Sequence, residues 1–206
     1  KIWTSYTMSI QKKKFKKLRK ELQYWQSELE YVQEVLVEWH ANFEEYYREY
    51  CKTMKINIHE LEQQNSKKVK EALPLGYGLV PESGSNIFED KTDEKEFKKI
   101  YKKLAKKIHP DIGGDENDFK KVTEALSEKN FEKLLDMCDK HDISIDVDDK
   151  INEVVLKQIQ LTKTKINNEK STYSWLLYSC EGDKRCKNNV VKKFLEHLFN
   201  YTVKVF

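Results

Sequence analysis

The stretch KTDEKEFKKIYKKLAKKIHPDIGGDENDFKKVTEAL, residues 91–126, contains the most specific pattern in this chain. Apolar side chains recur in its first half at steps of three and four residues, and this spacing predicts a helix with one apolar face. The positions are Phe97, Ile100 or Tyr101, Leu104 and Ile108. Pro110 disfavours the helical conformation at His109, so we expect the helix to end there.

A second helix is expected after Gly113-Gly114, a pair that permits a sharp turn. Asp115 or Asn117 is suited to the N-cap of this helix, and four apolar positions then fall on one face. They are Phe119, Val122, Ala125 and Leu126. The stretch therefore predicts an antiparallel helical hairpin. Lysines cover the polar face of its first helix, at Lys98, Lys99, Lys102, Lys103, Lys106 and Lys107.

These residues resemble the J-domain of DnaJ-like co-chaperones. In that family a helix reading roughly Tyr-x-x-Leu-Ala precedes a His-Pro-Asp loop, and a helix reading Phe-x-x-Ile-x-x-Ala-Tyr follows it. The matching residues here are Tyr101, Leu104, Ala105, His109, Pro110, Asp111, Phe119, Val122 and Ala125, with Leu126 where the family has Tyr. The resemblance covers residues 91–126 of 206 and implies a minimal J-protein without Gly/Phe-rich or zinc regions.

The resemblance implies a co-chaperone, not an enzyme, that binds a DnaK-type chaperone and stimulates its ATP hydrolysis. The residues expected to bind the chaperone are His109, Pro110, Asp111, Lys98, Lys102, Lys103, Lys106 and Tyr101. Asp111 is suited to accept charge-assisted hydrogen bonds from a partner Arg, and the lysines would attract an acidic surface. We expect no catalytic residue, no cofactor and no metal.

The segment before the basic helix departs from the family pattern. A J-domain opens with a short helix that carries Tyr-x-x-Leu-Gly, whereas residues 75–92 (LGYGLVPESGSNIFEDKT) show no such helix. The front helix is therefore absent, displaced to residues 58–73, or replaced by another element.

A long heptad pattern lies nearer the N-terminus. Apolar residues alternate by three and four positions, which is typical of a coiled-coil helix that needs a partner helix. This seam consists of Phe15, Leu18, Leu22, Trp25, Leu29, Val32, Leu36, Trp39, Phe43, Tyr46 and Tyr50. Its partner is a second copy, another helical protein, or the C-terminal region, which we expect to form a helical hairpin around a turn at residues 181–184.

Composition favours an all-α protein. Gly and Pro number only 6 and 3, which argues against a turn-rich β fold, and the net charge of +3 does not demand a nucleic-acid partner. No apolar run reaches the roughly twenty residues of a membrane span, so we expect no membrane span. The predicted segments are an N-terminal coiled-coil arm (1–73), a linker (74–90), a J-domain-like module (91–141) and a C-terminal helical hairpin (142–206).

The four cysteines, Cys51, Cys138, Cys180 and Cys186, contain no CxxC pair. We expect free thiols in a reducing compartment and hence a cytoplasmic location. In the alternatives, Cys180 and Cys186 form a disulfide or, with His197, bind a metal.

Two other functions fit the sequence. The chain could be a helical scaffold of a larger assembly in which the hairpin only packs. Small J-proteins with an HPDxGGD loop and coiled-coil arms look similar to proteins of large DNA viruses and phages, so a viral particle is one such assembly. Nucleic-acid binding through residues 12–20 is the third class, and we do not expect it.

Overall fold

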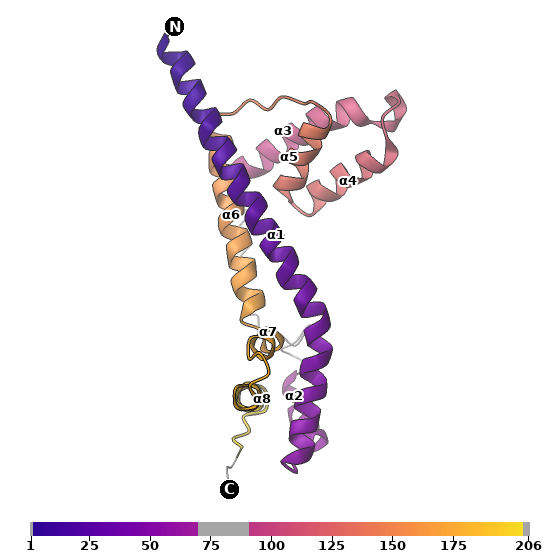
Figure 1. Cartoon of the computed structure of the whole chain (residues 1–206). Coiled ribbons are helices and arrows are strands. Elements are labelled where there is room, and N and C mark those ends of the chain that lie inside the picture. The colour runs from indigo at the N-terminus through magenta and orange to yellow at the C-terminus, as the bar shows by residue number, and fades with distance from the viewer. Residues whose placement is uncertain (1, 70–90, 204–206) are drawn as a thin grey trace. The chain divides into compact units, whose positions relative to one another are not determined.

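The computed structural model describes residues 2–69 and 91–203, with side chains from 10–63 and 95–203. Within these residues every regular element is a helix, so the predicted all-α fold is confirmed (Figure 1). The elements are α1 (Ile2–Thr53), α2 (Ile58–Val69), α3 (Lys91–Ile108), the 3-10 helix η1 (Pro110–Ile112), α4 (Glu116–Ser127), α5 (Phe131–Lys140), α6 (Asp149–Lys170), α7 (Tyr173–Tyr178) and α8 (Lys184–Phe199). The predicted linker, 74–90, lies outside the described residues.

The chain divides into two compact units. Of the described residues, the first unit contains 2–27 and 91–164, and the second contains 28–69 and 165–203. Both α1 and α6 therefore contribute to each unit. The residues around the His-Pro-Asp loop share their unit with the first half of α1.

Among the described residues, no helix is long and apolar enough to span a membrane.

The first unit is built around the predicted hairpin of α3 and α4. The apolar face of α3 is buried as its spacing predicts, with Phe97, Ile100, Leu104 and Ile108 at most 4% exposed. Val122 and Ala125 of α4 are fully buried in the same core. Helix α5 closes this core with Phe131, whose ring centroid lies 4.8 Å from that of Phe97.

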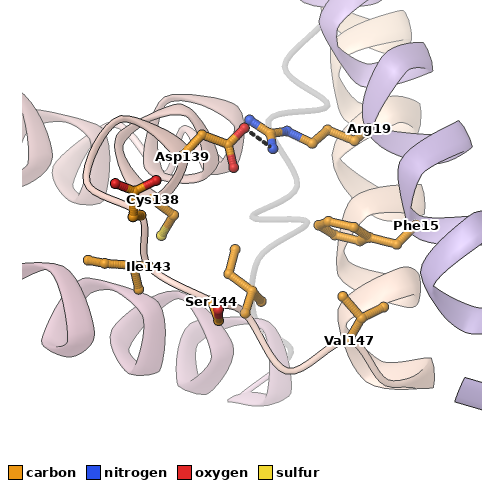
Figure 2. Close-up of a pocket in the computed structure, with 9 residues that line it drawn as sticks. Phe15, Arg19, Cys138, Asp139, Ile143, Ser144 and Val147 are labelled. Atoms are coloured by element: carbon orange, nitrogen blue, oxygen red, sulfur yellow. Dashed lines mark hydrogen bonds and ion pairs between the residues drawn. The ribbon is translucent and has the colours of Figure 1, made fainter.

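Helix α1 also enters this core, through Leu18 and Leu22 of the heptad seam. Arg19, on the same helix, reaches across to α5, where it donates a 2.6 Å hydrogen bond to Asp139 (Figure 2). Seven of the eleven seam residues are buried, and the other four, Phe15, Trp25, Trp39 and Tyr46, pack against core residues. The seam therefore finds its partner helices largely within this chain.

In the first unit α1 and α6 are parallel. Gln11 Nε2 donates to Asp149 Oδ1 at 2.6 Å, and further along both helices Lys163 Nζ donates to Glu21 Oε1 at 3.0 Å. The contacts advance in the same direction along the two helices, which fixes their relative orientation. A parallel pair requires a long connection, and helices α3 to α5 provide it.

The second unit has an aromatic core. Phe43 of α1 packs against Phe194 of α8 and Tyr173 of α7, with ring centroids 5.0 and 6.0 Å apart. Helices α7 and α8 meet at the turn predicted at residues 181–184, in which Gly182 has φ 92°. The region predicted as a hairpin, 142–206, instead contains three helices, because α6 ends at Lys170 and α7 is separate from it. Asp183 caps α8, because its carboxylate accepts the backbone N–H groups that open the helix.

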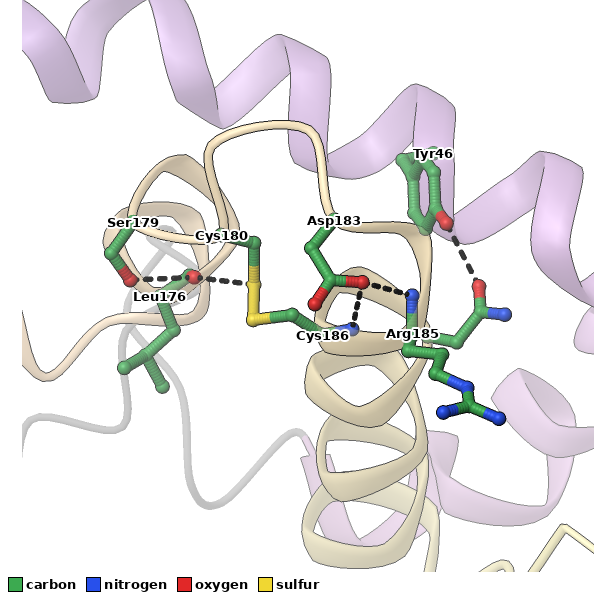
Figure 3. The surroundings of a disulfide bond; sticks show 8 residues. Tyr46, Leu176, Ser179, Cys180, Asp183, Arg185 and Cys186 are labelled. Carbon is green, nitrogen blue, oxygen red and sulfur yellow. Dashed lines mark hydrogen bonds between the residues drawn. A yellow bond between two sulfur atoms is a disulfide. The ribbon is translucent and has the colours of Figure 1, made fainter.

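Cys180 and Cys186 form a disulfide across this turn, with their Cα atoms 5.6 Å apart (Figure 3). The expectation of free thiols is wrong for this pair, because the turn between α7 and α8 brings the two side chains together. The disulfide alternative is confirmed, and the metal alternative is wrong, since the two sulfur atoms are bonded to each other and neither is a free thiolate. His197 Nδ1 lies 2.6 Å from the Tyr173 hydroxyl. Cys51 and Cys138 are free, and burial raises the pKa of each thiol to about 11.

Candidate functional site

The His-Pro-Asp loop is a single turn of 3-10 helix that starts where α3 ends. His109 leaves the helical conformation, with φ −63° and ψ 135°, as expected for a residue before proline. Its carbonyl oxygen accepts the backbone N–H groups of Ile112 and Gly114, both at 3.1 Å, and Gly113 N–H donates to Pro110 O at 2.9 Å. These bonds fix the backbone of the tip from within.

The two glycines after the loop are needed for different reasons. Gly113 has φ 84°, in the left-handed region that glycine adopts without steric cost. Gly114 lies against the end of α3, where an added Cβ would be 2.1 Å from the carbonyl oxygen of Ile108. The predicted sharp turn is therefore present, and the second glycine allows the chain to pass close to the helix it has left.

The side chains of His109 and Asp111 are held side by side at this tip. His109 Nδ1 accepts the backbone N–H of Asp111 at 3.2 Å, and its ring packs edge-on against Phe119 with centroids 4.8 Å apart. Because Nδ1 is the acceptor, the neutral imidazole carries its proton on Nε2, which has no hydrogen-bond partner among the described residues. The Asp111 carboxylate is 86% exposed, so both groups are available to a partner.

The lysines of α3 separate into two stripes. Lys98, Lys102 and Lys106 are exposed and follow each other at four-residue steps, so they share the helix face that leads to His109. Lys103 belongs to the other stripe: its Nζ donates to Asp146 Oδ2 at 3.0 Å, and this bond lowers the pKa of Asp146. The four lysines predicted to bind the chaperone therefore lie in two environments: three are exposed on one face, and Lys103 is bonded to Asp146.

Tyr101 differs from the other predicted residues because it is half-buried and packs against the core of the first unit. The structure therefore brings His109, Pro110 and Asp111 together with the exposed lysine stripe, and places Tyr101 and Lys103 in contacts with their own chain.

No family model, curated protein or solved structure matches this chain.

A buried carboxylate joins the hairpin to Lys140 and His141 at the end of α5. Asp118 of α4 is 4% exposed and accepts hydrogen bonds from Lys140 Nζ at 2.6 Å and His141 Nε2 at 2.9 Å. The bond from Lys140, with that from His141, lowers the pKa of Asp118. Its own N–H donates to Asp115, which is the observed N-cap of α4 rather than Asn117. The sequence gives no local signal for these ion pairs, because the partners lie 22 and 23 residues away.

A second network joins α5 to α1. Arg19 contacts Asp139 at 2.6 Å and Asp136 at 2.9 Å, and its Nε lies 3.6 Å from Glu132. Burial raises the pKa of Glu132 to about 7, although the nearby guanidinium opposes this. More than a hundred residues separate Arg19 from these carboxylates, so sequence spacing does not predict the network.

Proposed function

We propose that this protein is a co-chaperone that binds a DnaK-type chaperone through the tip of the α3–α4 hairpin and stimulates its ATP hydrolysis. The main support is the joint exposure of His109 and Asp111 on a loop whose backbone is held by its own hydrogen bonds. A fixed and exposed pair of polar groups costs little entropy to bind, which suits recognition.

The tip is suited to a partner that presents hydrogen-bond donors and acceptors close to each other on its surface. The Asp111 carboxylate is suited to charge-assisted hydrogen bonds from an arginine, and His109 Nε2 is suited to donate to a carbonyl or carboxylate. Lys98, Lys102 and Lys106 would attract an acidic surface and speed encounter. The hydrolysis itself belongs to the partner, and this chain supplies the contact that triggers it.

The same arrangement gives the first half of α1 a role in the proposed function. Its residues Leu18 and Leu22 lie in the core beneath the hairpin, and Arg19 ties it to α5. This helix would therefore hold the binding tip in place, in addition to any part in targeting or oligomerisation. A scaffold protein would need the helices but not the exposed tip, so substitutions confined to the tip distinguish the two functions.

The first prediction concerns single-turnover ATP hydrolysis by a cognate DnaK-type chaperone. The wild-type protein should accelerate hydrolysis, and His109→Gln or Asp111→Asn should reduce that acceleration by at least about tenfold, equivalent to about 1.4 kcal/mol of interaction. The matched control is Asp142→Asn, since Asp142 is also exposed but lies away from the tip.

A charge reversal tests the lysine stripe in the same assay. Lys102→Glu should weaken stimulation most at low salt, where attraction between charged surfaces is least screened. Lys120→Glu makes the same change at an exposed site on α4 and should have little effect. Absence of stimulation by the wild-type protein would refute the proposed function, and stimulation that survives both tip substitutions would place the contact elsewhere.

A further inference from the structure

A hollow of about 520 Å³ lies in the first unit, between α1 and the segment that connects α5 to α6. Its apolar lining comes mainly from Phe15 of α1 and from Ile143, Ile145 and Val147 of the connecting segment (Figure 2). This volume is within the range of roughly 300–1,000 Å³ found for ligand sites in proteins. The proposed co-chaperone tip uses none of these residues.

The connecting segment has the pattern of a β-strand but no neighbouring strand. Residues 143–148 belong to no helix, and half-buried Ile143, Ile145 and Val147 alternate with exposed Ser144 and Asp146. This period of two is that of an extended chain. Among the described residues, the backbone N–H groups of 144–147 have no hydrogen-bond acceptor.

Contacts with α3 hold this segment in place from one side. Lys103 Nζ donates to Ser144 O at 3.4 Å and to Asp146 Oδ2 at 3.0 Å, and Lys107 donates to His141 O. Ile143 and Ile145 also pack against the core of the unit. In an extended chain the N–H and C=O of one residue point to the same edge, so the edge that carries Ser144 O faces α3. The free edge therefore carries the N–H groups of Ile145 and Val147. It is preformed, and binding would not have to order it.

We propose that the hollow binds a peptide in an extended conformation, which adds as a strand along this segment through the N–H groups of Ile145 and Val147 and places alternate apolar side chains against Phe15 and Val147. The N–H groups of Ile145 and Val147 are two residues apart, and the carbonyl groups of another extended backbone present acceptors at this spacing. A small apolar molecule would fill the hollow without satisfying them.

Charge at the rim selects among peptides. Arg19 lines the hollow, but its guanidinium is already bonded to Asp136 and Asp139. Asp142 also lines it, and this carboxylate is exposed with no partner among the described residues. The rim is therefore complementary to lysine or arginine on the peptide, placed between its apolar residues.

The test uses the full chain and fluorescein-labelled nine-residue peptides with valine, leucine or isoleucine at every second position and lysine or serine between them. Fluorescence anisotropy should show saturable binding, tighter for the lysine peptides than for the serine peptides. Asp142→Lys should remove that preference. Asp142 is exposed, and its φ of 50° is one that Lys55 and Lys129 also adopt in this chain, so this variant should fold normally.

Strand addition has a specific signature in the peptide backbone. The tightest peptide is made again with N-methyl groups on its odd or on its even amides, which removes donors on one edge at a time. One version should bind at least about tenfold more weakly and the other should bind normally, because only one edge faces the protein. Equal binding of both versions, or loss with both, would overturn the proposal.

The location is tested by filling the hollow. Val147→Arg should reduce peptide binding at least about tenfold, whereas Val37→Arg, the same change at a residue 79% exposed, should leave it unchanged. Unaltered binding by the Val147 variant, or no binding of any peptide, would refute the proposal. Sedimentation that shows a dimer abolished by Val147→Arg would mean that a second copy occupies the site, and would also overturn it.

Discussion

Glu132 is a buried carboxylate whose charge is incompletely compensated. It is 6% exposed, and neither of its carboxylate oxygens has a hydrogen-bond partner among the described residues. The nearest cation, Arg19, is 3.6 Å away and is shared with two other carboxylates. Desolvation therefore outweighs attraction and raises the pKa of Glu132 from 4.5 to about 7, so the folded protein binds this proton more tightly than the unfolded chain does.

This shift makes stability depend on pH. Below pH 4.5 the carboxyl is protonated in both states, so its contribution to stability is fully present, and it is lost as the pH rises to about 7. The second prediction is that Glu132→Gln, which stays neutral, improves the unfolding free energy relative to wild type more at pH 8 than at pH 5. The difference should be at most about 3 kcal/mol.

Urea denaturation at the two pH values measures this effect. Glu128→Gln is the control, because Glu128 carries the same group on the surface, paired with Lys133 at 2.9 Å. Its substitution should change stability by less than about 0.5 kcal/mol at either pH. If Glu132→Gln has the same effect at pH 5 as at pH 8, Glu132 is ionised in the folded protein throughout this range.

Helix α1 belongs to the core of the first unit over its first half. Leu22 is fully buried among residues of α3, α5 and α6, whereas Tyr24, two residues further on, is 60% exposed. The third prediction is that Leu22→Ala lowers the free energy of unfolding by about 2–5 kcal/mol, because it leaves a cavity in that core. Tyr24→Ala should change it by less than about 0.5 kcal/mol.

The comparison is made by urea denaturation followed by circular dichroism, with hydrogen exchange to locate the change. Loss of protection in α3 to α5 on Leu22→Ala is expected, since these helices share the core with Leu22. Unchanged protection there would show that α1 is an arm on which the hairpin does not depend.

Periodic helices were predictable from the sequence because their signal is local. The three- and four-residue spacing gives α1, α3 and α4 and the buried face of each, and Pro110 marks the end of α3. The break between α6 and α7 was not predicted, because it depends on Thr172, whose side chain caps α7 by accepting the N–H of Trp175. Thr172 is a single residue of modest helix propensity within an apolar stripe, so the sequence does not indicate that one helix ends and another begins there.

The candidate site was predictable in part for the same reason. His109, Pro110 and Asp111 lie at the tip because local backbone bonds place them there. The division of the lysines was not predictable, because Lys103 faces a segment more than forty residues away. The hollow beside α1 depends on packing between segments over a hundred residues apart, which no spacing rule describes.

The whole molecule has two hydrophobic cores on shared helices. The first contains residues of α3 to α6 with Leu18 and Leu22, and the second contains Phe43 and residues of α7 and α8. Because α1 and α6 each contribute to both units, a loss of structure in one unit can spread to the other along a continuous helix. The extent of this spread depends on how strongly each core stabilises its own part of that helix.

The disulfide provides a way to weaken the second core alone. Cys180 and Cys186 are six residues apart, and loss of so short a cross-link should cost roughly 2 kcal/mol by loop entropy. The fourth prediction is that dithiothreitol increases amide hydrogen exchange in α7 and α8 and leaves that of α3 to α5 unchanged. The variant with both Cys180→Ser and Cys186→Ser should show the same pattern without reductant and no response to it. An equal rise in α3 to α5 would mean that the two cores unfold as one cooperative unit, since reduction acts directly only on the turn between α7 and α8.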